Sequence, residues 1–149
     1  MTKPRNLVLA LALALACSES QPPAASLQPG TPCSYCRMTV SSQNVGAQIA
    51  ASGEDPRFFD DIGCLAAYLR EHPLTPGAVL YVGDHQTGKW VDARVAVYSR
   101  GDAITTPMYS HIVAHVNAAA RESDASVKGA KPLTVADVFG ATLGDAREK

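Results

Sequence analysis

The sequence lacks three features that would each point to a common class of protein. Basic residues do not cluster beyond the first five positions, and 13 lysines and arginines are balanced by 14 acidic residues for a net charge of −1. Binding to nucleic acid therefore has no electrostatic support. No apolar run reaches the roughly 20 residues that a membrane-spanning helix needs. No combination of nucleophile, general base and oxyanion-stabilising group is apparent, so we predict that the protein is not an enzyme.

The first 16 residues have the pattern of a signal peptide. Lys3 and Arg5 precede an uncharged run of leucine and alanine over residues 7–16, and Cys17 follows it. Small residues before this cysteine resemble a bacterial lipobox, in which Cys17 is lipidated and becomes the first residue of the mature protein. We therefore predict an exported lipoprotein, anchored to a membrane and facing the periplasm or the cell exterior. The alternative is an ordinary signal peptide that is cut nearby.

The chain after the signal peptide divides into a tether and a folded region. Residues 17–32 are mostly Ser, Gln, Pro, Ala and Gly, a composition that predicts a flexible tether. About 115 residues remain, enough for one compact domain or two small fused half-domains. We place the first half-domain at residues 33–84 and the second at residues 85–149.

Hydrophobic patterns in the folded region predict the order strand, helix, strand twice. The residues expected to form strands are 39–52, 78–82 and 90–98. The expected helices are 62–71, capped by Asp60 or Asp61, then 110–122, and a short one at 133–139 that begins at Thr134. Long crossover connections are not expected. The predicted fold class is therefore α+β, with two small related ββαβ-like halves that each pack a short sheet on one helix.

The number and spacing of the cysteines indicate which kinds of site they can form. The sequence has 4 cysteines, and without Cys17 an odd number remains, which cannot form a closed set of disulfides. Cys33 and Cys36 form a C-x-x-C pair, which can serve as a redox dithiol, as half of a zinc site, or as a soft-metal site. A second such pair for zinc, a histidine directly after Cys36 for haem, and a preceding buried strand as in thioredoxin are all missing. Cys64 has a simpler interpretation as a small apolar residue of the first helix.

Methionine near the cysteine pair favours the soft-metal interpretation. Met38 lies two residues after Cys36, and a thioether is a poor zinc ligand but a good one for copper(I). Met108, in Thr106-Pro107-Met108, is a second candidate, and His111 follows it at helical spacing. Each has an ordinary alternative, because methionine often fills gaps in cores and helical histidines are often solvated. We therefore predict metal ligands at Cys33, Cys36, Met38, Met108 and His111, give His115 a weaker claim, and interpret His72 and His85 as surface residues.

Four short motifs, in order and at similar spacing, resemble those of the nitrous oxide reductase accessory lipoproteins, the NosL family. They are Cys33-x-x-Cys36-x-Met38, Phe59-Asp60-Asp61-Ile62-Gly63-Cys64, Trp90-Val91-Asp92-Ala93 and Thr106-Pro107-Met108. The resemblance implies an α+β fold of two related halves and a copper(I) chaperone that supplies the copper centres of nitrous oxide reductase. Two positions depart from the family. Arg37 stands where glycine is common, and Tyr109-Ser110-His111 replaces a glycine-rich stretch, which leaves the ligand set and the client open.

The predicted function is thus copper(I) binding at a membrane surface. The partners implied are a copper-enzyme client or a copper transporter, together with the membrane that holds the lipid anchor. Two alternatives stay open from the residues alone. One is a thiol-disulfide oxidoreductase that uses Cys33 and Cys36, and the other is a membrane-tethered interaction module without a metal.

Overall fold

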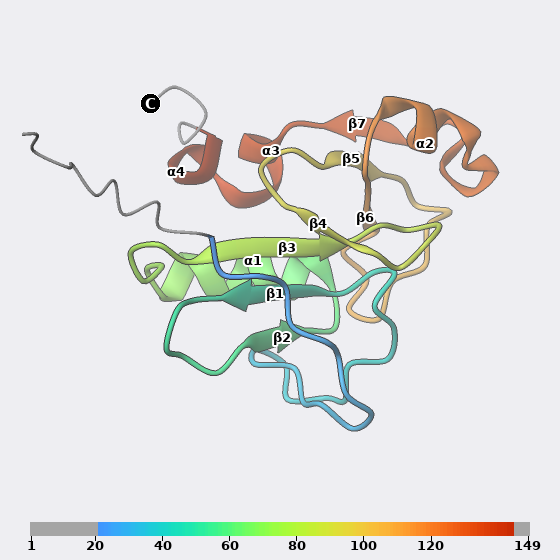
Figure 1. Cartoon of the computed structure of the whole chain (residues 1–149). Helices are drawn as coiled ribbons and strands as arrows, with labels where there is room; N and C mark the ends of the chain where they lie inside the picture. The colour runs from blue at the N-terminus through green and yellow to red at the C-terminus, as the bar shows by residue number, and fades with distance from the viewer. Residues whose placement is uncertain (1–20, 145–149) are drawn as a thin grey trace, which may run out of the picture.

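Two small antiparallel sheets form the framework of the protein, and the computed structural model describes residues 21–144 (Figure 1). The first sheet has the strand order β2-β1-β3-β4, and the second has the order β6-β5-β7. The strands are β1 (Ala47–Ala50), β2 (Arg57–Phe59), β3 (Val79–Gly83), β4 (Trp90–Asp92), β5 (Val97–Arg100), β6 (Ile112–His115) and β7 (Lys131–Leu133). The predicted signal peptide and the predicted lipidation site at Cys17 lie outside the described residues.

The two sheets repeat one topology, which confirms the predicted α+β fold of two related halves. In the first half β1 pairs with both β2 and β3, and helix α1 (Ile62–Glu71) connects the two outer strands. In the second half β5 pairs with both β6 and β7, and α2 (Ala118–Ser123) with a 3-10 turn, η1 (Ala125–Val127), connects them. Strand β4 extends the first sheet beyond β3. Two short helices, α3 (Val135–Phe139) and α4 (Ala141–Gly144), end the described chain.

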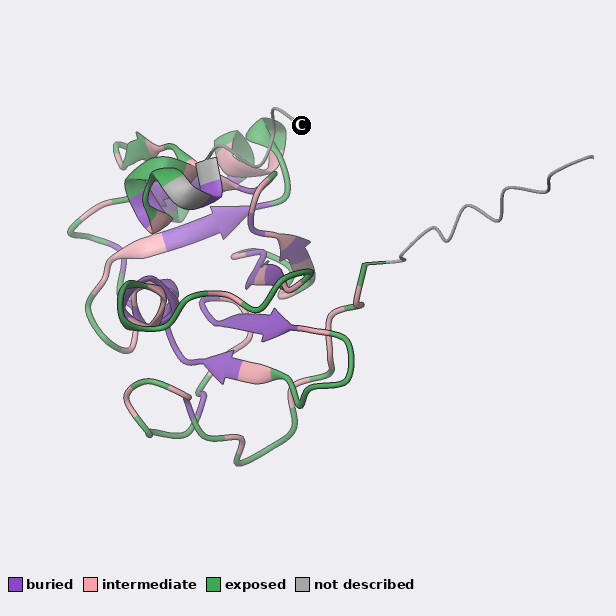
Figure 2. Ribbon diagram, turned by 90° about the vertical axis from the view of Figure 1, so that its left-hand side faces the viewer, coloured by how far each residue is buried: buried purple, intermediate pink, exposed green. Residues whose placement is uncertain are grey.

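Helix α1 forms where the sequence predicts it, and its start is set by a buried carboxylate. Asp61 is the N-cap, and its Oδ1 accepts a hydrogen bond from the Gly63 N–H at 2.6 Å. Ile62 and Leu65 are wholly buried, so one face of the helix packs on the core while its last turn reaches solvent. Figure 2 shows the buried residues gathered on the strands and on this helix. The predicted start of α3 is also found, since Thr134 caps it with a reciprocal bond to Asp137.

The helix predicted at residues 110–122 is wrong. Its first part is strand β6, which pairs with β5 from Arg100 opposite Ile112 to Val97 opposite His115. Only Ala118–Ser123 is helical, and Asn117 is its N-cap. A short run such as Ile112-Val113-Ala114 suits a strand as well as a helix, and the open edge of β5 decides between them.

The flexible tether predicted through Pro32 is also wrong from Gln21 onward. The segment runs beside β1, as the blue trace in Figure 1 shows. The buried side chain of Gln48 donates to the Ala25 carbonyl oxygen and accepts from the Ala25 N–H. Tyr81 adds a bond from its hydroxyl to the Pro22 carbonyl oxygen at 2.8 Å. These side chains pair with the backbone as a neighbouring strand would, which composition alone cannot reveal.

The two halves share one apolar core. It runs from Phe59 and Leu65 in the first half to Tyr98 and Ala114 in the second. At the junction Asp84 and Ala114 form an isolated bridge, so the end of β3 lies against β6. Of residues 21–144, none belongs to a helix with the length and apolar character needed to cross a membrane.

Candidate metal centre

Three cysteine side chains converge on one point at the edge of the first half. The sulfur atoms of Cys33, Cys36 and Cys64 all lie within 4.8 Å of one another. Sulfur–metal bonds of about 2.3 Å, in a planar three-ligand arrangement, would place the sulfurs about 4 Å apart. The thiols are free, with Cys33 and Cys64 buried and Cys36 partly exposed. The cluster therefore has the dimensions of a three-thiolate site that opens to solvent on the Cys36 side.

The loop that carries Cys33 and Cys36 is held by backbone hydrogen bonds. The Cys33 N–H donates to the Met38 carbonyl oxygen at 2.7 Å, and the Arg37 N–H donates to the Cys33 carbonyl oxygen at 3.1 Å. The Ser34 N–H reaches the Phe58 carbonyl oxygen at 2.8 Å, which ties the loop to β2. Because α1 begins three residues after β2, Cys64 in its first turn faces this loop.

The three thiols differ in acidity. Burial acts to raise the pKa of Cys33, but the N–H groups of Asp60, Cys36 and Tyr35 that face its sulfur lower it below the ordinary value. Burial raises the pKa of Cys36, and the neighbouring Cys33 raises it further. The pKa of Cys64 is raised well above its usual range by burial and by the charges of the other two. Cys33 is thus the most acidic of the three thiols, and a metal that binds all three sulfurs as thiolates must release protons.

Asp61 connects Met108 to this cluster. Its Oδ2 accepts the Met108 N–H at 3.0 Å, while its Oδ1 caps α1, whose first turn holds Cys64. Met108 and Cys64 line the same surface hollow of about 360 Å³, together with Tyr35 and Ser110. The structure therefore brings Met108 to the cysteine side of the molecule, although the helix assumed for its spacing does not exist.

Met38 and His111 remain predictions as ligands. Met38 is in the cysteine loop, and 58% of its surface is exposed, so its thioether is free of the core. His111 precedes β6 rather than lying on a helix, and its Nδ1 is 2.6 Å from the Ile104 carbonyl oxygen. That contact requires the proton on Nδ1 and leaves Nε2 as the nitrogen with a free lone pair, the form in which histidine binds metals.

Among residues 21–144, three that are not glycine have left-handed backbone conformations, and each is a candidate ligand or adjacent to one. They are Arg37 with φ 67°, Tyr109 with φ 56° and His111 with φ 58°. These positions fall in the two segments where the resemblance indicated glycine in place of the residues found here. A side chain at such an angle meets the following carbonyl oxygen, and glycine avoids this cost. The loops therefore keep their shape despite the loss of glycine.

Replacement of Arg37 by glycine should stabilise the protein. We expect the free energy of unfolding to rise by about 0.5–1 kcal/mol, because relief of the left-handed strain outweighs the greater freedom of glycine in the unfolded chain. Urea unfolding of the purified chain measures this change. The control is Arg57→Gly in β2, where the backbone is extended and glycine should destabilise. A destabilised Arg37→Gly variant would contradict the strain argument.

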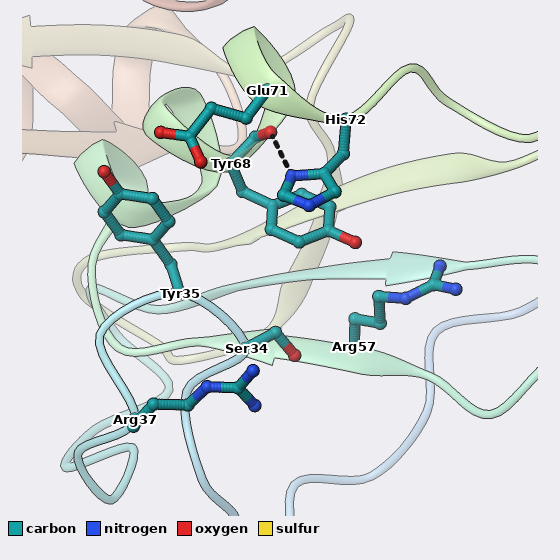
Figure 3. A pocket seen from close by; sticks show the side chains of 7 residues that line it. All are labelled: Ser34, Tyr35, Arg37, Arg57, Tyr68, Glu71 and His72. Atoms are coloured by element: carbon teal, nitrogen blue, oxygen red, sulfur yellow. Dashed lines mark hydrogen bonds between the residues drawn. The ribbon is translucent and has the colours of Figure 1, made fainter.

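A hollow of about 440 Å³ lies next to the cysteine loop (Figure 3). Arg37 and Ser34 of the loop face it from one side, and Arg57 projects from β2. The rings of Tyr68 and His72 stack opposite them with centroids 4.1 Å apart. Glu71 also lines the hollow, and Arg57 pairs with Glu54 at 2.9 Å, so the hollow carries charges of both signs.

The sequence did not predict two groupings of side chains, one of cysteines and one of histidines with an aspartate. The sequence indicates an apolar filler at Cys64, yet its sulfur belongs to the cysteine cluster. It also indicates a surface residue at His85 and a helical residue at His115. In the structure His115 is wholly buried at the end of β6 and shares Asp124 with His85. No local pattern marks either grouping, since each joins residues from separate elements.

Comparisons with known proteins agree with this arrangement. The family model described as NosL matches residues 23–143, most of the chain. The fold is similar to the crystal structure of the copper chaperone NosL from Shewanella denitrificans, with a TM-score of 0.65 and 15% sequence identity, covering 80% of this chain and 98% of that one. No curated protein sequence matches the chain. The family that the four motifs predicted is therefore confirmed, and the chain belongs to the NosL family.

Proposed function

We propose that this protein is a lipid-anchored copper(I) chaperone that delivers copper to an enzyme of the nitrous oxide reductase type. It is an accessory metal-binding protein rather than an enzyme. The observation that carries the proposal is the convergence of Cys33, Cys36 and Cys64 within 4.8 Å. Three thiolates with a thioether nearby form a soft ligand set, which favours copper(I) over harder ions. Membership of the NosL family and the similarity in fold to a copper chaperone support the same metal.

The burial of the ligands suits a protein that must both hold and release its cargo. Cys33 and Cys64 are buried and would provide a fixed pair of sulfurs, while Cys36 is partly exposed. Met38, with 58% of its surface exposed, stands next to this accessible side. A metal-binding side chain of the client could therefore reach copper(I) from the solvent side. It could replace Cys36 or Met38 as a ligand before the buried thiolates dissociate from the metal. Stepwise exchange of this kind avoids free copper(I).

Substitution of the exposed thioether tests its role directly. Met38→Leu should weaken copper(I) binding by about tenfold, or about 1.4 kcal/mol, because leucine keeps the shape and removes the soft sulfur. Competition with a chromophoric copper(I) chelator measures the affinity of the reduced, purified chain. Val95→Ala is a matched control, since Val95 is also 58% exposed and lies outside both the cysteine loop and α1. Equal affinities for the wild type and Met38→Leu would remove Met38 from the ligand set.

The Met38→Leu variant also separates the chaperone from the thiol oxidoreductase, when its dithiol-dependent turnover is measured without metal. An oxidoreductase needs two thiols that close to a disulfide, and its turnover should survive Met38→Leu without added metal. A third thiol within 4.8 Å of both Cys33 and Cys36 favours a metal site instead, because a disulfide would leave it unused. Dithiol-dependent turnover by the metal-free chain, unchanged in Met38→Leu, would support the oxidoreductase.

Location and partners form part of the proposal. The signal-peptide pattern and the small residues before Cys17 support export and lipidation there. A lipid would hold the folded part beside a membrane, where a copper transporter or a copper-enzyme client can meet it. The hollow with Arg37 and Arg57 next to the cysteine loop is the surface that we assign to this meeting. A mature amino-terminal peptide without lipid mass on Cys17 would exclude the anchor.

A further inference from the structure

A second group of metal-binding side chains lies at the junction of the two sheets. It consists of His85 after β3, His115 at the end of β6, and Asp124 between α2 and η1. Their ligand atoms all lie within 4.8 Å of one another. The Asp124 Oδ2 accepts from His85 Nδ1 at 2.7 Å and from His115 Nε2 at 2.9 Å. Three separate elements thus direct two imidazole nitrogens at one carboxylate oxygen.

The surroundings of this group carry negative charge. Asp124 accepts hydrogen bonds from both rings through one oxygen and, through the other, from the Ser126 N–H and hydroxyl. Asp84, next to His85 in the chain, is also buried, and it accepts hydrogen bonds from Thr87 and from the Val116 N–H. No lysine or arginine of residues 21–144 pairs with either carboxylate. Two buried carboxylates beside two imidazoles favour a bound cation.

The position of His115 is unusual for a structural histidine. Its side chain is wholly buried, and its Nδ1 has no hydrogen-bond partner among the described residues. Buried polar atoms in folded proteins nearly always have a partner, so this one calls for an explanation. An aromatic ring would fill the same space without that cost. The polar nitrogen that has a partner, Nε2, faces Asp124 and His85.

We propose that His85, His115 and Asp124 form a second metal site, for a borderline divalent cation of the zinc(II) type. Two imidazole nitrogens and one carboxylate oxygen are a common ligand set for such ions and leave a fourth position for water. The open position faces the His85 side, where 22% of the side chain is exposed, against 9% for Asp124 and none for His115. This ligand set is harder than the three thiols, so the two centres select different ions.

Binding would replace the two protons that now bridge the rings to Asp124. Imidazole binds a metal as the neutral ring, so each ring would keep one proton, on the nitrogen that faces away from the metal, and any second proton would go to solvent. In His85 that nitrogen is Nε2 of a partly exposed ring, and in His115 it is the buried Nδ1. Metal–nitrogen bonds of about 2.0–2.1 Å need ligand atoms about 3.3 Å apart, so the rings must separate from Asp124 by about half an ångström. The unpaired N–H of His115 keeps the affinity below that of a closed four-ligand zinc site.

The site is separate from the cysteine cluster and independent of the proposed function. Ile112, at the start of β6, lines the hollow shared with Cys64, whereas His115 ends the same strand. Three residues of strand span about 10 Å. Occupancy of one centre therefore does not require the other.

Nitrogen NMR of the histidine rings tests the proposal on the wild-type chain. The thiols are first saturated with silver(I), a soft ion that binds sulfur, and zinc(II) is then added. We expect one further equivalent of zinc(II) to shift His85 Nδ1 and His115 Nε2, with His72 and His111 unchanged. If zinc(II) shifts neither nitrogen, or shifts all four rings alike, the site does not exist.

Variants supply a second readout. His85→Phe and Asp124→Asn should each lower the zinc(II) affinity of the silver-saturated chain at least about tenfold. Asparagine at position 124 keeps an oxygen for the Ser126 N–H, so the turn that Asp124 caps remains. His72→Phe, at the exposed end of α1, is the matched control and should bind zinc(II) as the wild type does. Unchanged affinity in both test variants would overturn the proposal.

Discussion

Cys36→Ser should weaken copper(I) binding at least about a hundredfold, the largest effect on function that we expect. Serine is smaller and harder, and its hydroxyl keeps its proton at neutral pH, so the soft cation loses one of three sulfur donors. Cys36 is the most exposed of the three thiols, and the fold should tolerate this change. Chelator competition gives the affinity, and circular dichroism checks that the variant is folded.

A second cysteine variant and the pH dependence of the wild type show whether all three sulfurs bind copper(I). Cys64→Ser should lose a similar factor in copper(I) affinity if all three sulfurs bind the metal. If Cys64 only packs in the core, the variant should lose stability and keep its copper(I) affinity.

Acid should weaken copper(I) binding by the wild type. Cys36 and Cys64 both have raised pKa values, so each gives up a proton to bind, and a lower pH favours the protonated thiols. An affinity that does not change between about pH 8 and pH 6 would contradict binding by all three thiolates.

Asp61→Ala should have the largest effect on stability, a loss of about 3 kcal/mol in the free energy of unfolding. Alanine removes the N-cap of α1, worth about 1 kcal/mol, and leaves the Met108 N–H without its acceptor, which costs about 1–3 kcal/mol. The Asp61 side chain is wholly buried, so water cannot replace it. Chemical unfolding measures the loss, provided that the slope with denaturant stays unchanged.

Asparagine at position 61 separates the two contributions. Asp61→Asn keeps an oxygen for the Gly63 N–H but turns an amino group toward the Met108 N–H, so it retains the cap and breaks only the link to the Met108 loop. We expect it to lose roughly two thirds as much stability as Asp61→Ala. Equal losses in the two variants would mean that the link to Met108, rather than the cap, carries the effect.

Helix α1 and strand β3 were predictable because local patterns and packing agree there. Asp61 before an apolar stripe is a helix start in sequence and in structure, and the strand pattern at 78–82 corresponds to β3. The helix prediction failed at residues 112–115 for the opposite reason. Their apolar spacing fits a helix, but the open edge of β5 takes them as a strand, and hydrogen bonding to a distant segment outweighs local preference.

The cysteine site was likewise predictable in part, where the ligands are close in sequence. Cys33 and Cys36 could be identified as a pair because two intervening residues force their side chains close together. Cys64 could not be added from sequence, since its distance to the pair depends on the bonds that tie Ser34 to Phe58 and on the first turn of α1. His85 and His115 meet only because the end of β3 bridges to β6.

The sequence by itself determined the family, the α+β class and the presence of a soft cysteine pair. These depend on residue identity and short spacing, which survive in any arrangement of the chain. Only the tertiary structure decided that Cys64 completes the thiol cluster, that Gln48 holds the segment around Ala25, and that Asp124 joins a histidine of the loop after β3 to one of strand β6. Each of these contacts joins residues from separate elements, because the buried groups in each half must find partners that local patterns do not specify.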